Sequence, residues 1–100
     1  MDIKRRNEAG VITYSLKGRL DTNTAPELEA VITKDLNNAK QINLELKDLD
    51  YISSAGLRVV LMTHKQMTNK GGSLNVLHPK EEVMDVFDMT GFSSFLNIEE

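Results

Sequence analysis

The predicted fold depends on the stretch Leu49-Asp50-Tyr51-Ile52-Ser53-Ser54-Ala55-Gly56-Leu57. A hydrophobic strand is expected before it, at residues 42–46, and a long helix with one apolar face after it, at about residues 55–69. The two serines therefore fall on a strand-to-helix turn. The first N–H groups of a helix have no partner within the helix and carry partial positive charge. Such a turn holds a hydroxyl near the surface and suits a phosphate or another anion.

Upstream of this stretch, the sequence pattern predicts a β-hairpin. Residues 11–17 alternate between apolar and polar side chains, which indicates a strand with one buried face. Residues 2–6 are expected to pair with it through a turn at residues 7–10. Residues 18–23 are then expected to form a loop.

A first helix follows that loop. Thr24 and Glu27 have the spacing of a capping box, and Pro26 is tolerated in a first turn. Apolar residues at helical spacing continue the pattern until a pair of asparagines, which is expected to end the helix at about Asn37.

Downstream of the serine turn, the long helix is expected to end at a pair of glycines. Residues 73–77 then form a strand, and a third helix begins at Pro79 or Lys80 and stops at Gly91. The apolar residues within 92–98 predict a last short strand at the edge of the sheet.

The predicted order is therefore strand, strand, helix, strand, helix, strand, helix, strand. This alternation is typical of an α/β fold, here a single domain over residues 1–100 with a mixed, mostly parallel sheet. Polar residues such as Asn43, Glu45 and Asn75 alternate with the apolar residues of the strands. Because sheets covered on both faces have continuously apolar strands, we expect the helices mainly on one face.

Composition narrows the possible functions. The chain has 100 residues, no cysteine and a formal net charge of −3, which excludes disulfides and cysteine-bound zinc and argues against nucleic-acid binding. The basic cluster at residues 4–6 is interpreted as a solvated edge strand. No apolar stretch of membrane-spanning length and no secretory signal is visible, so no membrane association and a cytoplasmic location are expected.

Metal and nucleotide chemistry have little support in the sequence. His64 is interpreted as a partly buried packing residue, and His78 lies in a turn without a third ligand at suitable spacing. Asp21, Asp48 and Asp50 are interpreted as turn and cap residues. Neither common glycine-rich nucleotide loop is present, and no cofactor is expected.

A serine hydrolase must be weighed because of the serine turn. A nucleophile elbow requires Gly-x-Ser-x-Gly, and the first glycine is missing around Ser54. We therefore expect no enzyme. The turn itself leaves two interpretations open: a helix-capping serine, worth about 1 kcal/mol, or a functional hydroxyl beside Ala55 and Gly56, whose small size leaves room for a partner.

Three segments resemble a known family in the right order. The first is Asp48-Leu49 with Tyr51-Ile52-Ser53-Ser54-Ala55-Gly56-Leu57, and the second is Gly18-Arg19-Leu20-Asp21-Thr22-Asn23-Thr24-Ala25. The third is Gly71-Gly72 followed by Val83 to Phe87 and by Asp88-Met89-Thr90-Gly91. Together these segments resemble the STAS domain of bacterial anti-sigma factor antagonists over nearly the whole chain.

The resemblance implies a phosphoprotein that regulates transcription by partner switching. The unphosphorylated form binds an anti-sigma factor that is also a serine kinase, and binding frees the sigma factor. The kinase phosphorylates the antagonist, and a serine phosphatase reverses the reaction. The modified serine of the family corresponds to Ser54, with Ser53 as the second choice. Ser53 replaces a common aspartate, and Arg58 replaces a small residue.

The resemblance and the expected strand directions together predict one partner-binding surface, made of residues Asp21, Thr22, Asn23, Ser53, Ser54, Ala55, Gly56 and Arg58. The alternative is a STAS scaffold that is never phosphorylated, in which Ser54 only caps the helix.

Overall fold

The computed structural model describes all of residues 1–100. The elements follow one another in the predicted order, with one additional 3-10 turn, η1, near the C-terminus. Their bounds are β1 Asp2–Glu8, β2 Val11–Leu20, α1 Ala25–Asp35, β3 Gln41–Ile52, α2 Ser54–Asn69, β4 Ser73–Leu77, α3 Glu81–Met89, η1 Phe92–Ser94 and β5 Asn97–Glu99. The third helix thus begins slightly later than predicted.

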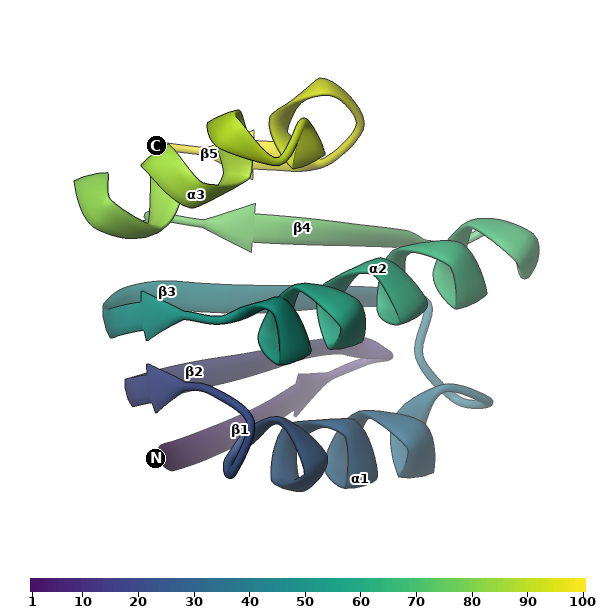
Figure 1. Cartoon of the computed structure of the whole chain (residues 1–100). Coiled ribbons are helices and arrows are strands. Elements are labelled where there is room, and N and C mark those ends of the chain that lie inside the picture. The colour runs from purple at the N-terminus through teal and green to yellow at the C-terminus, as the bar shows by residue number, and fades with distance from the viewer.

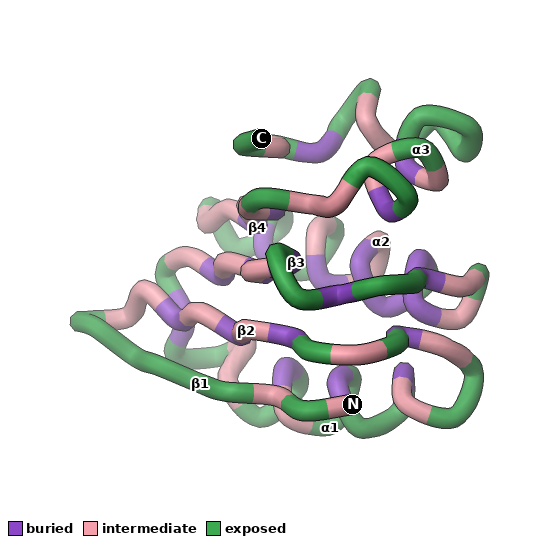
Figure 2. Tube along the Cα trace, turned by 90° about the vertical axis from the view of Figure 1, so that its left-hand side faces the viewer, coloured by how far each residue is buried: buried purple, intermediate pink, exposed green.

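The five strands form one mixed sheet in the order β1-β2-β3-β4-β5. β1 and β2 form the predicted antiparallel hairpin, and every other neighbouring pair is parallel. Figure 1 shows α1 and α2 lying in front of the strands, and the turned view of Figure 2 shows α3 on the same side of the sheet. The prediction of helices mainly on one face is confirmed.

The hydrophobic core lies between the sheet and these helices because the strands alternate as predicted. Ile12, Tyr14 and Leu16 of β2 are buried, whereas the residues between them point to the other face. On that other face polar residues line up across the strands. Asn43 Nδ2 donates to Thr13 Oγ1 at 3.3 Å, and Asn75 Nδ2 donates to Asn43 Oδ1 at 3.1 Å. These bonds satisfy amides that an apolar cover would leave unpaired.

Two strands extend further than the sequence indicated. Residues 18–20 and 49–52 were expected to be loop and turn, but they continue β2 and β3. The two strands keep their parallel pairing through two register shifts, so that Leu20 pairs with Ile52. Gly18 adopts a φ of 109°, a conformation that favours glycine, next to one of these shifts. As a result Asp48 and Asp50 lie in a strand rather than in turns.

The basic cluster on β1 is only partly the solvated edge that was expected. Arg5 reaches Asp35 at the end of α1, where Nε and Nη2 donate to the two carboxylate oxygens at 2.8 and 2.7 Å. The buried Tyr14 hydroxyl donates to the same carboxylate. This three-residue contact ties α1 to the hairpin, while Lys4 and Arg6 remain exposed.

Candidate functional site

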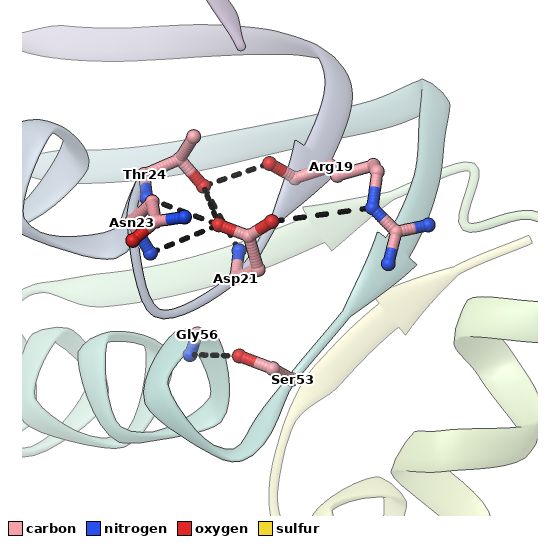
Figure 3. A network of polar contacts seen from close by, with 6 residues as sticks. All are labelled: Arg19, Asp21, Asn23, Thr24, Ser53 and Gly56. Atoms are coloured by element: carbon pink, nitrogen blue, oxygen red, sulfur yellow. Dashed lines mark hydrogen bonds and ion pairs between the residues drawn. The ribbon is translucent and has the colours of Figure 1, made fainter.

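The serine turn and the loop after β2 lie at the same end of the sheet. The Ser53 amide donates to the Leu20 carbonyl at 2.9 Å, which joins the end of β3 to the end of β2. Asp21 follows Leu20 directly, so the loop at 21–24 lies beside the first turn of α2 (Figure 3). Both halves of the predicted partner-binding surface are therefore neighbours in space.

The two serines have different structural roles. Ser53 is the N-cap of α2, with extended backbone angles, and its Oγ accepts from the Gly56 amide at 3.4 Å. Ser54 is the first helical residue, is exposed, and forms no side-chain hydrogen bond. The cap is therefore Ser53, and the interpretation of Ser54 as a capping residue is wrong. The Ser54 hydroxyl points to solvent from a rigid support.

Gly56 is small for a reason other than the one expected. It is buried, and a Cβ placed there would lie 2.7 Å from Leu20 Cγ and 2.9 Å from Ile52 Cγ1. Real Cβ atoms do not approach other carbons this closely, so the glycine lets α2 pack against the ends of β2 and β3. The small size of Gly56 therefore serves the packing inside the domain. Ala55 beside it is half-buried.

Asp21 organises the loop that leads into α1. Its Oδ1 accepts from the amides of Asn23 and Thr24 at 3.0 and 3.1 Å. Thr24 does not form the predicted capping box with Glu27, because its backbone is already helical and its hydroxyl donates to the Arg19 carbonyl at 2.7 Å. Desolvation acts to raise the pKa of Asp21, but the hydrogen bonds from Thr24 and Asn23 outweigh it and lower the pKa. The carboxylate thus stays charged.

Two residues that the sequence reasoning missed lie beside this loop. The Arg19 guanidinium is 4.1 Å from the centre of the Tyr51 ring, and its Nε is 3.9 Å from Asp21 Oδ2. Register pairing of Arg19 with Tyr51 across β2 and β3 explains the contact. Tyr51 is 39% exposed although large and aromatic. Arg19 and Tyr51 lie side by side because β2 and β3 extend past the expected loops, which the sequence pattern did not indicate.

The remaining predicted residues are distributed around this end of the domain. Thr22 and Asn23 are exposed on the loop, and Arg58 is exposed one turn into α2. Neither serine contacts a histidine: His64 packs against Phe95 with ring centres 5.0 Å apart, and His78 Nδ1 lies 2.8 Å from Glu45. The turn therefore lacks the base that activates a serine nucleophile.

No group of three or more metal-ligating side chains is gathered anywhere in the structure. The roomiest hollow, about 440 Å³, lies at the opposite end of the domain beside Asn37 and Gly71, and its lining is mostly polar. None of the helices is both long enough and apolar enough to cross a bilayer. None of the hollows in the structure is lined by residues 21–24 or 53–56, so the serine turn and the neighbouring loop form an open surface.

The sequence model of the STAS domain matches residues 2–100. The chain belongs to the STAS domain family. BtrV of Bordetella bronchiseptica, described as a candidate anti-sigma factor antagonist, is 37% identical over 89% of this chain and 78% of its own length. The anti-sigma-B factor antagonist of Bacillus subtilis is 29% identical over 98% of this chain and 88% of its own length. The predicted family is confirmed.

Solved structures share the fold. The unphosphorylated form of the anti-sigma factor antagonist SpoIIAA superposes with a TM-score of 0.87 at 19% identity, covering 99% of this chain and 89% of that one. A Thermotoga maritima protein described as a candidate antagonist superposes with a TM-score of 0.92 at 22% identity, covering 98% and 86%. At these identities the likeness shows a shared fold.

Proposed function

We propose that this STAS domain is an anti-sigma factor antagonist that switches partners through phosphorylation of Ser54. The unphosphorylated domain binds an anti-sigma factor with serine kinase activity and so releases the factor's target. A serine phosphatase restores the binding form. The names of the relatives support the antagonist role, and the proposal places the protein in the cytoplasm, where sigma factors act.

One observation carries the choice of Ser54. Ser53 and Ser54 are adjacent, but Ser53 is occupied as the helix cap while the Ser54 hydroxyl is exposed and unbonded. A kinase can therefore reach Ser54 without breaking a contact of the fold. Phosphorylation of Ser53 would instead remove the cap from Gly56. The alternative, a scaffold that is never phosphorylated, explained Ser54 as a helix cap. That explanation no longer applies to Ser54, because Ser53 is the cap.

The chemistry requires ATP bound to the kinase. The Ser54 oxygen attacks the γ-phosphorus, a new O–P bond forms, and the bond to the leaving ADP oxygen breaks. The hydroxyl proton passes to a base that the kinase supplies, since no base lies beside the serine in this chain. The domain is thus the substrate and binding partner, not an enzyme.

The added phosphate explains the loss of binding. It brings about −1.5 to −2 charges and three acceptor oxygens to a surface that presents a neutral hydroxyl. A partner fitted to the unmodified turn meets added bulk and charge. A tenfold loss of affinity requires only about 1.4 kcal/mol. The fold itself should tolerate the group, since a helix N-terminus favours negative charge. The similar structure of the Bacillus cell fate determinant SpoIIAA has been solved in the phosphorylated form.

Incubation with Mg-ATP and the anti-sigma factor kinase from the same organism tests the proposal. Mass spectrometry is expected to find one phosphoserine, at residue 54, in the native domain and none in Ser54→Ala. Ser53→Ala is the matched control and should still be modified. Modification at Ser53 or elsewhere, or none at all, would overturn the assignment.

The Ser54→Asp variant tests the switch itself. It should fold normally and bind the kinase at least tenfold more weakly than the native domain in isothermal titration. Equal binding would contradict the electrostatic mechanism.

A further inference from the structure

Arg58 is the arginine of this chain that has no acidic partner. Arg5 pairs with Asp35, Arg6 with Glu8, and Arg19 with Asp21. No ion pair or hydrogen bond involves the Arg58 side chain, which is exposed on α2. A guanidinium with five donors is therefore available at the surface, one helical turn from Ser54.

The turn that carries Ser54 is also free of negative charge. α1 has Glu27 in its first turn and α3 has Glu81 and Glu82, but α2 has no acidic residue there. No carboxylate of the first turn competes with a phosphate for Arg58 or repels one. Ser53 is neutral as well, and it stands where the STAS antagonists commonly have an aspartate. The charged carboxylate of the neighbouring loop, Asp21, is already engaged by the amides of Asn23 and Thr24 and lies near Arg19.

Helix geometry brings the two positions together. Residues four apart on a helix lie on the same face, with Cβ atoms about 5–6 Å apart. A helical side chain leans toward the N-terminus of its helix, so Arg58 covers the turn that contains Ser54. The order of an anion followed four residues later by a cation is the favourable one. A guanidinium also matches two phosphate oxygens at once.

We propose that Arg58 holds the phosphate of phosphorylated Ser54 within the same chain. This inference rests on the proposed function, because it concerns the modified state of Ser54. Arg58 is then a two-state residue: it is free to meet an acidic group of the partner before phosphorylation, and it is engaged by the phosphate afterwards. The switch removes a cation from the docking surface at the same moment as it adds an anion.

The competing cation nearby is Arg19. Its guanidinium already lies over the Tyr51 ring and near Asp21. It would have to leave both to reach the phosphate, whereas Arg58 would leave only water. The geometry therefore favours Arg58, and the choice between the two arginines can be measured.

The experiment installs phosphoserine at position 54 by genetic code expansion, so that no kinase is needed. Phosphorus NMR then follows the second ionisation of the phosphate against pH in the native background and in Arg58→Gln. Contact with a cation favours the dianion, so the pKa of the phosphate should be lower in the native background by roughly half a unit or more. Arg58→Lys should retain part of this difference, because it keeps the charge but not the fork.

Lys65→Gln is the matched control, since it removes an exposed cation of α2 that lies about three turns from Ser54. It should leave the pKa of the phosphate at the native value. Equal pKa values of the phosphate in the native background and in Arg58→Gln would overturn the inference. So would a phosphate pKa that rises in Arg19→Gln but not in Arg58→Gln. If the kinase modifies Ser54 but the pKa does not depend on Arg58, the proposed function stands and this inference falls.

Discussion

Ser53 Oγ lies 3.4 Å from the amide nitrogen of Gly56 and caps α2, whereas the adjacent Ser54 hydroxyl is unbonded. The structural role thus belongs to Ser53, and the proposed phosphorylation falls on its neighbour Ser54. The distance is long for a hydrogen bond, so the bond contributes at the lower end of the usual range for caps.

Replacing the two serines should therefore have different effects on stability. Ser53→Ala should lower the free energy of unfolding by about 0.5–1 kcal/mol. Ser54→Ala should change it by less than about 0.5 kcal/mol, as for a surface substitution. Urea denaturation of both variants at neutral pH measures the difference. An equal cost at both positions would contradict the assignment of the cap to Ser53.

Gly56→Ala should destabilise the domain even though alanine is the better helix former. The propensity gain is about 1 kcal/mol, but the new Cβ would lie 2.7 Å from Leu20 Cγ, a branch point that cannot simply swing away. Overpacking of this kind costs about 1–3 kcal/mol, so a net loss of roughly 1 kcal/mol is expected.

The control for this clash is a double-mutant cycle with Leu20→Ala. If the steric explanation holds, Gly56→Ala becomes neutral or stabilising once the Leu20 side chain is absent. The same cost in both backgrounds would show that the contact with Leu20 is not the cause.

Most of the architecture could be predicted from hydrophobic periodicity. The alternation in residues 11–17 predicts one buried face of β2, and the polar residues Asn43 and Asn75 correctly predict that the other face of the sheet lacks helices. These patterns are local and persist over several residues, so pairing with distant strands does not change them.

The ends of β2 and β3 could not be predicted in this way. Asp48 and Asp50 are typical of turns, yet they continue a strand because β2 pairs with it through two register shifts. The Thr24 hydroxyl similarly bonds to Arg19 rather than capping α1. In both cases a contact with another segment overrides the local preference. Gly56 illustrates the same limit, because its contacts with Leu20 and Ile52 appear only once α2 packs on the sheet.

Stability should fall in acid partly through Asp35. The hydrogen bonds from Arg5 lower the pKa of this carboxyl, desolvation opposes them, and the bond from Tyr14 adds to the lowering. A carboxyl whose pKa is lowered by folding stabilises the folded state at pH values above its unfolded pKa of about 3.9. This stabilisation is lost as the pH falls through the pKa of the folded state. The Asp35 contribution should thus be complete at pH 7, begin to shrink near pH 4 and disappear only below the lowered pKa of the folded state.

Asp35→Asn tests this contribution. It should cost about 1–2 kcal/mol at pH 7, because it weakens charge-assisted hydrogen bonds, and less at pH 3. Asp88→Asn is the control, since Asp88 is exposed and forms no ion pair. Urea unfolding at pH 7, 5, 4 and 3 measures both variants. A cost for Asp35→Asn that does not shrink in acid would contradict the linkage.

Tyr51 should contribute to partner binding, although it was not among the predicted partner-binding residues. It is held under Arg19 at the end of the sheet that carries the serine turn, and it remains 39% exposed. Aromatic and arginine residues supply much of the binding energy at protein interfaces. Tyr51→Ala should therefore weaken binding to the kinase by tenfold or more, which corresponds to about 1.4 kcal/mol.

Two further variants make the result specific. Arg19→Ala should weaken binding as well, because it removes one partner of the stacked pair and leaves the other free to move. Met89→Ala removes a side chain from a residue that is 86% exposed at the end of α3, and it should leave affinity unchanged. Isothermal titration on variants with native melting temperatures measures all three. Native affinity in Tyr51→Ala would exclude the ring from the interface and confine the partner to the serine turn and the loop at 21–24.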